Sequence, residues 1–559
     1  MGRRLDRTTK VLLALRVASV LVPQYGYIHA DEFFQSTEIS SGDILGTDAY
    51  RPWEFTSSRP IRSAAFVHLF AFVPYQLLRI VEHTPYLRLV LPRLVACTLS
   101  FLVDAVAFRI KGLAAVKVTA SSYLAFTYFT RTFSNLTETI LFSLLLLMSV
   151  STVKTVCVKV STAARDNACT TEANGKGEKK DTGKKEAKKG TKVKNVLMNT
   201  KGGAEQTEMA EMEVCKFVKQ SPDSCLFLYA SIISAGVFNR PTFICFAIMP
   251  IVHRFWKTTF ANFIGSCVRL AILALPAATV FVILDSVYYR GLAECLADPL
   301  GSVVVTPFNF LLYNSKPSNL TNHGLHPRWL HLLVNIPIIF GAHSLFFYCD
   351  FYRLIRRPVA FDADSRFLLN CMIVPTTLLS LFPHQEPRFL LPLVLPFALL
   401  HAQKVFRSSR SRFFWYSFNF FLSIFFGFLH QASVVPTQMY SGIKGKVIYY
   451  QTYMPPRHLS PVFERRIVVD LKEIPLAGLE ATLRKHHEGY LVYPSGAESV
   501  VATALQNAVC SVKDGTALWP HFATEFLLSA WRTCSFDLNC LFLDSMVLNR
   551  MRFLCESVL

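Results

Sequence analysis

Residues 11–38, VLLALRVASVLVPQYGYIHADEFFQSTE, pass directly from an apolar run into a cluster of carboxylates and aromatic rings. Only Arg16 interrupts the apolar run between Val11 and Pro23, and basic residues precede it. No A-x-A-like cleavage site follows, so the run predicts an uncleaved signal-anchor helix whose far end faces the lumen. The polar residues after it are therefore expected at a membrane exit.

The composition of the whole chain also indicates a membrane protein. Its 559 residues are 52% hydrophobic, 13% aromatic and 17% charged, and the mean hydropathy is +0.34. Because soluble domains carry about 25% charged residues, this chain has too few charges to cover a water-facing surface. Its 47 Phe against 24 Gly exclude collagen-like, disordered and small disulfide-scaffold classes. An all-α polytopic membrane protein is the expected class.

The formal net charge of +20 is concentrated in part in one low-complexity stretch. Residues 171–200 hold nine Lys against four acidic residues and almost no large apolar side chains. Such a composition is typical of a disordered segment, and its basic character favours the cytosol. We therefore interpret the positive charge as a solvated insert at 156–222 and expect no nucleic-acid partner.

Apolar runs of spanning length predict about ten transmembrane helices. In addition to the first helix, they lie near residues 62–82, 86–110, 113–130, 137–154, 262–288, 328–348, 366–383, 388–405 and 413–434. A shorter pair, 225–237 and 241–252, is broken around Arg240, and a second polar break contains Arg131. Since arginine is costly in hydrocarbon, both breaks should face protein or a water-filled cavity and are candidates for a buried anionic site.

These patterns divide the chain into four segments. They are an N-terminal membrane module 1–155 with a luminal loop 27–61, the insert 156–222, a second membrane module 223–434 with a luminal loop 289–327, and a C-terminal luminal domain 435–559. Alternating runs such as 446–453 predict an α/β fold for the last segment. Its four cysteines are Cys510, Cys534, Cys540 and Cys555, which in an oxidising compartment can pair in three ways.

The first cluster of candidate site residues follows the first helix. If residues 32–38 are helical, then Asp31, Gln35 and Glu38 share one face. Such a face is suited to a hydroxylated acceptor, with one carboxylate poised to remove a proton. The alternative is an amphipathic interfacial helix with solvated acids. Later in the loop, Arg51 and Trp53 are suited either to sugar contact or to anchoring in the headgroup zone.

The second cluster is the polar stretch PHQEPRFL at 383–390, between two apolar spans. Arg388 is suited to bidentate contact with phosphate, and His384 can stabilise charge on a departing phosphate. The alternative is a short loop in which Glu386 and Arg388 neutralise each other. No cysteine or histidine spacing is typical of a zinc site, so we expect no metal.

Eight motifs stand in order along the chain and carry a family resemblance. They are HADEFFQSTE (29–38), DILG (43–46), RPWEF (51–55), RTFSN (131–135), FNRPTF (238–243), TPFNFLLYN (306–314), HQEPRFL (384–390) and TYMPPRHL (452–459). Together they resemble the PIG-Z type mannosyltransferases of glycosyltransferase family 22. One departure is Ala30, which stands where the family usually has proline.

This resemblance implies a GT-C fold in the endoplasmic reticulum membrane, with the active site facing the lumen. The implied reaction adds a fourth, α1,2-linked mannose to the trimannosyl core of glycosylphosphatidylinositol (GPI) precursors. The implied donor is dolichyl phosphate mannose, so the partners are a lipid-linked donor and a GPI glycolipid acceptor within the membrane. Since the donor is β-linked and the product α-linked, one inverting displacement is expected, without a cofactor.

Such a displacement needs one base and one site for the leaving phosphate. We expect Asp31 to deprotonate the acceptor 2-hydroxyl, with Glu32 orienting the acceptor or serving as the base in its place. Arg388, with His384 and Arg240, would stabilise the departing phosphate. The remaining candidates for substrate binding are His29, Gln35, Glu38, Arg51, Trp53, Arg131 and Glu386.

Three alternatives remain at this point. The first is an enzyme of the same family that adds the third mannose of the anchor or a mannose of an N-glycan precursor. The second is a lipid transporter or scramblase, because broken helices with intramembrane arginines also occur there. The third is a non-catalytic subunit of an anchor-assembly complex.

Overall fold

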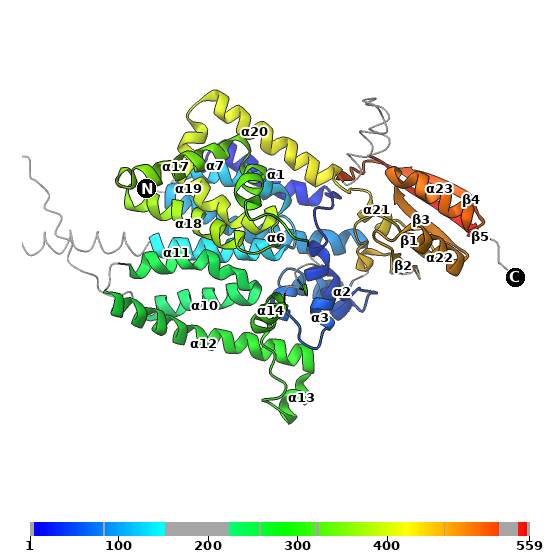
Figure 1. Cartoon of the computed structure of the whole chain (residues 1–559), viewed down its shortest axis with the longest axis horizontal. Helices are drawn as coiled ribbons and strands as arrows, with labels where there is room; N and C mark the ends of the chain where they lie inside the picture. Colours follow the sequence, from blue (N-terminus) through cyan, green and yellow to red (C-terminus); the bar gives the residue numbers. More distant parts are fainter. Residues whose placement is uncertain are drawn as a thin grey trace, which may run out of the picture. The chain divides into compact units, whose positions relative to one another are not determined.

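Helices dominate the described chain up to residue 439, and a five-stranded sheet follows them (Figure 1). The structure, a computed structural model, describes residues 5–81, 84–150, 223–256, 259–316, 318–319, 324–462, 464, 466–524 and 546–555. The insert expected at 156–222 lies outside these residues.

The α-helices occur in the following order. They are α1 (Arg7–Leu21), α2 (Glu38–Leu45), α3 (Trp53–Thr56), α4 (Ala64–Val67), α5 (Phe72–Leu78), α6 (Pro85–Lys111), α7 (Leu113–Ser121), α8 (Tyr123–Thr127), the helix Ser134–Val150, α10 (Asp223–Asn239), α11 (Ile244–Phe255), α12 (Phe260–Arg290), α13 (Leu292–Ala297), α14 (Thr306–Asn314), α16 (Ile336–Phe340), α17 (Ser344–Arg356), α18 (Ala363–Ser380), α19 (Val394–Phe406), α20 (Ser409–Ile424), α21 (Val434–Met439), α22 (Leu476–His486) and α23 (Glu498–Asn507). The 3₁₀ and π segments are η1 (Phe33–Thr37), η2 (Pro241–Phe243), η3 (His331–Asn335), η4 (Gly341–His343), η5 (Pro358–Ala360), η6 (Pro387–Leu393), η7 (Phe425–Leu429), η8 (Arg457–Leu459) and η9 (Ser495–Ala497).

Five helical stretches in the described ranges are long and apolar enough to cross a membrane. They are Pro85–Lys111, Phe260–Arg290, His331–Arg356, Pro387–Phe406 and Ser409–Leu429. Shorter apolar helices cover Ser134–Val150, Cys225–Asn239 and Pro241–Phe255. The polytopic membrane class therefore agrees with the structure, while the figure of about ten crossings stays a prediction.

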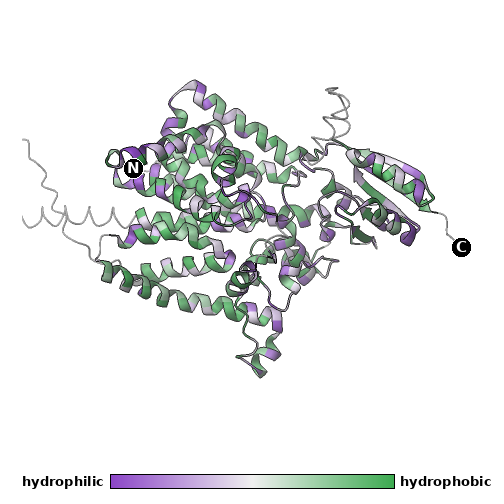
Figure 2. Ribbon diagram, viewed as in Figure 1, coloured by the Kyte–Doolittle hydropathy of each residue, from purple (hydrophilic) through white to green (hydrophobic). Residues whose placement is uncertain are grey.

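Helix α12 shows how these stretches differ from helices of a soluble protein. Figure 2 shows that most of α12 is hydrophobic. Its apolar side chains remain largely exposed, with Val268 at 53%, Ile272 at 58% and Leu275 at 59%. A contiguous apolar surface of this kind requires an apolar environment. Lipid tails supply that environment, so α12 is the clearest lipid-facing element.

Two of the apolar runs were expected to form single continuous helices, and this prediction is wrong. The run 62–82 contains the short helices α4 and α5, and the run 113–130 is divided between α7 and α8. At the second break, Ser122 adopts an extended backbone and its hydroxyl accepts a hydrogen bond from Leu124 N at 3.3 Å. Such a side-chain cap ends one helix and starts the next. The break expected at Arg240 is confirmed, because Arg240 is extended between α10 and η2.

The span Pro387–Phe406 is the most buried of the five, at 72% of its apolar window. It contributes Leu393 and Phe397 to the main hydrophobic core, together with residues such as Phe133 and Leu369. Because this span is enclosed by other helices, its first turn is held in place within the protein. That turn contains Arg388.

The charge that interrupts the first apolar run has a partner inside the protein. Arg16 is fully buried, and its Nη1 lies 2.6 Å from Asp104 Oδ2 of α6. A charged side chain at this depth is tolerated when an opposite charge neutralises it. The pair therefore fastens α1 to α6.

The C-terminal segment contains a mixed sheet with the strand order β2-β1-β3-β5-β4. The strands are β1 (Gly445–Tyr449), β2 (Arg466–Asp470), β3 (Glu488–Pro494), β4 (Cys510–Leu518) and β5 (Leu548–Cys555). Strand β1 runs parallel to β2 and β3, whereas β5 is antiparallel to β3 and β4. The alternating runs noted in the sequence thus correspond to an α/β unit.

Alternation along β1 gives the sheet two different apolar faces. Ile448 packs with Leu479 of α22 and Val501 of α23, so both helices cover one face (Figure 1). Val447 and Tyr449 point to the other face, where the cluster includes Tyr27 and Phe33 of the N-terminal loop. The sheet therefore forms one wall behind the loop that carries Asp31.

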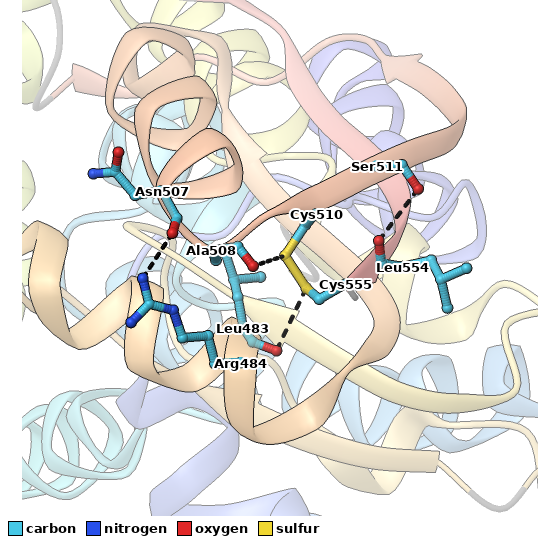
Figure 3. The surroundings of a disulfide bond; sticks show 8 residues. All are labelled: Leu483, Arg484, Asn507, Ala508, Cys510, Ser511, Leu554 and Cys555. Atoms are coloured by element: carbon cyan, nitrogen blue, oxygen red, sulfur yellow. Dashed lines mark hydrogen bonds between the residues drawn. A yellow bond between two sulfur atoms is a disulfide. The ribbon is translucent and has the colours of Figure 1, made fainter. Parts of the chain in front are cut away.

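One disulfide connects the two ends of the β4–β5 pair. Cys510 and Cys555 are opposite each other in the antiparallel register and are bonded, with a sequence separation of 45 (Figure 3). Of the three pairings left open by the sequence, those that join Cys510 to another partner are thereby excluded. Cys534 and Cys540 lie outside the described residues.

Candidate active site

Backbone hydrogen bonds fix the loop after α1. Gly26 N donates to Gly427 O at 2.8 Å, and Tyr27 N donates to His430 O at 2.7 Å. A Cβ on Gly26 would lie 2.2 Å from the carbonyl oxygen of Phe426, so only glycine fits this approach. The buried Tyr27 hydroxyl donates to Met454 O at 2.8 Å. The loop is thus fixed between the helical part and the C-terminal segment.

The prediction that Asp31, Gln35 and Glu38 share one helix face is wrong. Residues 33–37 form a π-helix, in which each turn is wider than in an α-helix. The three side chains consequently meet different partners: Asp31 meets Arg388, Gln35 donates to Glu54 at 3.1 Å, and Glu38 faces the C-terminal segment. Of these three side chains, Asp31 is the one that reaches the second polar cluster.

Asp31 and Arg388 form the central contact between the two polar clusters. Arg388 Nη1 lies 2.5 Å from Asp31 Oδ2, and the two side chains are 7% and 21% exposed. Burial alone would raise the pKa of Asp31, but the charges of Arg388 and His29 hold that pKa well below its ordinary value. Asp31 is therefore an ionised carboxylate that solvent or a ligand can still reach.

The remaining residues of the second cluster surround Arg388. Arg388 donates to both carboxylate oxygens of Glu386, through Nη2 at 3.0 Å and through Nε. His384 Nε2 lies 2.7 Å from Glu386 Oε1, and His29 Nε2 lies 3.4 Å from Arg388 Nη2. The neutralisation of Glu386 by Arg388, expected as one alternative, is present. It coexists with the contact to Asp31, so the loop is part of a larger network.

Glu32 has a different environment from its neighbour Asp31. Its side chain is 1% exposed, and its two oxygens contact Arg93 at 2.6 Å and Arg131 at 2.8 Å. Burial opposes its ionisation, but these two guanidinium groups lower the pKa of Glu32 below its ordinary value. Thr132 Oγ1 also donates to Glu32 O at 2.6 Å. Arg131, expected to face a substrate anion, instead holds this carboxylate of its own chain.

Arg240, in the break between α10 and η2, lies close to the network around Arg388. Its guanidinium lies 5.1 Å from the ring centroid of Phe389, the residue after Arg388. Its Nη1 lies 3.2 Å from Ser134 Oγ, and its Nε lies 3.6 Å from the buried Glu138. The two arginine-containing breaks at 131–135 and 238–243 thus meet beside the candidate site.

The outer part of the N-terminal loop lies farther from Asp31. Arg51 is exposed and pairs with Asp43 and, at 3.2 Å, with the Tyr288 hydroxyl. Trp53 is 40% exposed and its ring stacks on Tyr313 with centroids 4.5 Å apart. Arg51 therefore contacts α12, and Trp53 contacts α14.

Glu38 connects the loop to the motif at 452–459. Glu38 Oε2 contacts His458 Nδ1, and both side chains are fully buried. Glu38 Oε1 accepts from Tyr50 N at 2.9 Å, while Arg88 donates to the carbonyl oxygens of His458 and, at 2.6 Å, Ser460. A buried carboxylate with this many partners positions the loop.

Within the described ranges, no group of three or more His, Cys, Asp or Glu side chains is arranged to hold a metal ion. The expectation of metal-independent chemistry stays a prediction.

The combination of an accessible aspartate, a buried arginine and a lipid-facing helical bundle is compatible with a reaction on a lipid-linked anion. The profile of the Alg9-like mannosyltransferase family matches residues 8–460. The chain belongs to this family. The family resemblance expected from the eight motifs is thereby confirmed.

Known relatives of this Alg9-like mannosyltransferase match about four fifths of its length. Human GPI alpha-1,2-mannosyltransferase 4 is 32% identical over 500 residues, covering 80% of this chain and 75% of the relative. GPI mannosyltransferase 4 of Aspergillus oryzae is 32% identical over 459 residues, covering 78% and 70%. Among solved structures, ArnT from Cupriavidus metallidurans bound to undecaprenyl phosphate is similar with a TM-score of 0.48 at 9% identity, covering 90% of this chain and 95% of that one.

Some residues of the Alg9-like site were not among the sequence candidates. Arg93 contacts Glu32, and Arg88 donates to the backbone of the 457–460 segment. Arg62 donates to Glu54 at 2.8 Å. A signal for the first two was present, because Arg88 and Arg93 lie inside the apolar run 86–110 and are as costly in hydrocarbon as Arg131. Arg62 stands at the first residue of the expected run 62–82, where an arginine gives no such signal.

Proposed function

We propose that this chain transfers mannose from dolichyl phosphate mannose to a trimannosyl GPI precursor and forms an α1,2 linkage. Membership in the Alg9-like mannosyltransferase family supports mannosyl transfer. The GPI substrate and the linkage are carried over from the names of relatives that match four fifths of the chain. The observation that carries the proposal is the partly exposed, ionised Asp31 beside Arg388.

In the proposed reaction, Asp31 removes the proton of the acceptor 2-hydroxyl. The oxygen attacks C1 of the donor mannose, the bond from C1 to the phosphate oxygen breaks, and dolichyl phosphate leaves with the electron pair. Inversion at C1 converts the β-linked donor into an α-linked product. Glu32 is a positioning residue in this scheme, because both of its oxygens are taken by buried arginines and its side chain is 1% exposed.

Arg388 is the proposed contact for the leaving phosphate. Its charge is already shared between Asp31 and Glu386, so further cations are needed to hold a phosphate. Arg240 beside Phe389 and His384 beside Glu386 are the nearest candidates. Guanidinium groups fixed before the reaction stabilise developing negative charge without reorganisation.

We further propose that the site faces the lumen of the endoplasmic reticulum. The sheet that carries the Cys510–Cys555 disulfide packs its other face on Tyr27 and Phe33 of the catalytic loop. Disulfides persist in oxidising compartments such as this lumen. The disulfide and Asp31 therefore belong on the same side of the membrane.

The test is mannose transfer by microsomes from cells lacking the endogenous activity and expressing this chain. With dolichyl phosphate mannose and a three-mannose GPI precursor, we expect a four-mannose product whose added residue is removed by an α1,2-specific mannosidase. Asp31→Asn should lower the rate by about 10²–10⁴-fold, as for loss of a general base. Asp48→Asn, which changes an exposed carboxylate of the same loop, should not.

The outcomes separate the alternatives. A product formed from a two-mannose precursor instead would indicate the enzyme for the third mannose. Full activity of Asp31→Asn would exclude Asp31 as the base. Activity that survives EDTA is expected, and its loss from purified enzyme would contradict a metal-independent reaction.

A further inference from the structure

A cavity of about 780 Å³ lies between α17, α18 and α19, away from the residues that surround Asp31. Its volume falls within the range of about 300–1,000 Å³ that is typical of ligand sites. Four cationic side chains line it: Arg353, Arg356, Arg357 and Lys404. The single acidic side chain in the lining is Asp350.

The charges in this cavity do not balance. Asp350 is 2% exposed, and its carboxylate is already engaged by Lys404 at 2.5 Å and Arg353 at 3.4 Å. Arg356 lies over the ring of Tyr352 at 5.6 Å. In the part of the chain that the structure describes, neither Arg356 nor Arg357 contacts a carboxylate. The lining therefore has an excess of positive charge and two exposed guanidinium groups.

The position of the cavity follows from two of the membrane spans. Pro387–Phe406 begins beside Arg388 and ends just after Lys404, about 25 Å farther along at helical rise. His331–Arg356 begins at His331, whose backbone N–H donates to Gln385 in the catalytic cluster, and ends in the cavity lining. Both spans thus run from the candidate active site to the cavity. The cavity therefore lies at the ends of both spans that are farther from the candidate active site.

Apolar side chains next to the cations are exposed at this surface. Ile355 is 65% exposed and Val359, in the turn between α17 and α18, is 92% exposed. Aliphatic side chains this exposed, beside arginines at the end of a span, match the boundary between hydrocarbon and headgroups. A soluble anion would gain nothing from these apolar neighbours, whereas a lipid contacts both groups at once.

We propose that this cavity binds the phosphate headgroup of an anionic phospholipid in the leaflet opposite the active site. Arg356 and Arg357 would contact the phosphate, and Ile355 and Val359 would contact the acyl chains. Basic pockets between transmembrane helices bind anionic headgroups by the same combination of charge and apolar contact. This site is separate from the one proposed for the donor.

The test uses the full chain in mixed micelles with increasing phosphatidylserine, and bound lipid is counted by native mass spectrometry. Arg356→Gln with Arg357→Gln should weaken binding by at least about fivefold, which corresponds to one surface cation. The matched control is Arg407→Gln with Arg410→Gln. It removes two exposed arginines, one directly after α19 and one in the first turn of α20, and neither lines the cavity. It should bind phosphatidylserine as the unmodified chain does.

Further variants keep the result interpretable if the glutamine pair folds poorly. Arg356→Lys with Arg357→Lys retains the charge and should retain binding. Ala360→Trp keeps every cation but fills part of the cavity, so it should weaken binding. Equal losses in the cavity and control pairs, or unchanged binding in both the glutamine pair and Ala360→Trp, would overturn the proposal. Displacement by soluble glycerophosphoserine at the lipid's own concentration would assign the site to free phosphates instead.

Discussion

The guanidinium of Arg388 lies 2.5 Å from the carboxylate of Asp31, although the two residues are 357 positions apart in the chain. This contact joins the proposed base to the proposed phosphate ligand. It therefore determines both the charge state of the base and the position of the cation. Its electrostatic consequence is measurable.

Loss of the Arg388 charge should move the acid limb of the pH profile. Burial raises the pKa of Asp31, and Arg388 is the largest influence that lowers it. In Arg388→Gln the burial remains, so the pKa of Asp31 rises and protonation removes the base at a higher pH. The residual mannose transfer of this variant should therefore fall off at higher pH than that of the unmodified enzyme. Arg388→Lys, which keeps the charge, should show a smaller displacement, and coincident limbs would contradict the assignment.

Glu32→Gln should reduce stability more than Asp31→Asn. The substitution leaves Arg93 and Arg131 buried without their carboxylate, and breaking such a buried pair costs about 3–5 kcal/mol. Asp31 is more exposed, so its substitution should change the thermal midpoint less. The measurement is thermal aggregation of both variants at one scan rate in one detergent. A Glu32→Gln midpoint equal to that of the unmodified chain would refute this role.

The same carboxylate predicts how stability depends on pH. The pKa of Glu32 is lower in the folded chain than its ordinary value, so its contribution is fully present above the unfolded pKa. That contribution is lost as the pH falls through the folded pKa. Below the ordinary range for glutamate, the unmodified chain should lose stability more steeply than Glu32→Gln. Parallel curves of thermal midpoint against pH would contradict this prediction.

Glu38 and His458 should behave as one unit. Both are fully buried and contact each other across 420 positions of sequence. Glu38→Gln and His458→Ala should each lower stability, and the double variant should lose less than the sum, with a coupling of about 0.5–3 kcal/mol. Mannose transfer should fall in all three, because the loop loses its anchor. His486→Ala on α22, outside this contact, is the control, and strictly additive effects would separate the two residues.

The Cys510–Cys555 bond should be present in the purified protein and should stabilise it. Peptide mapping without reduction should recover the two cysteines linked. Cys510→Ala should cost about 2–4 kcal/mol, the usual contribution of a disulfide. Cys225→Ala removes an exposed free cysteine and should cost little. Two free thiols at 510 and 555 would contradict the assignment.

The sequence grouped the candidate residues into clusters but could not predict the contacts between those clusters. His29, Asp31, Glu386 and Arg388 were predicted in two separate clusters, and the structure brings all four into one network. Local spacing could not show that Glu32 faces inward to Arg93 and Arg131, because those contacts depend on how three distant segments pack. The π-helix at 33–37 had no local signature either, so the expected shared face was wrong.

The fold was predictable to a similar degree. Composition and apolar runs indicated the membrane class, but the division of 113–130 at Ser122 depends on one hydroxyl cap within an apolar run. In the C-terminal segment, alternation predicted strands, whereas the order β2-β1-β3-β5-β4 depends on long-range pairing. Two of the four cysteines that the sequence left open are now paired with each other.

The partners of the N-terminal loop also set an order for biosynthesis. Residues 24–45 emerge early, yet their contacts come from Arg93, Arg131, Arg388 and His458. During synthesis, Glu32 can meet its first cation once residue 93 has been made and its second only after residue 131. Asp31 gains its cation much later, and Glu38 waits for residue 458. A nascent chain that already contains the entire HADEFFQSTE motif therefore lacks the contacts of Asp31 and Glu38 until residues 388 and 458 have been synthesised.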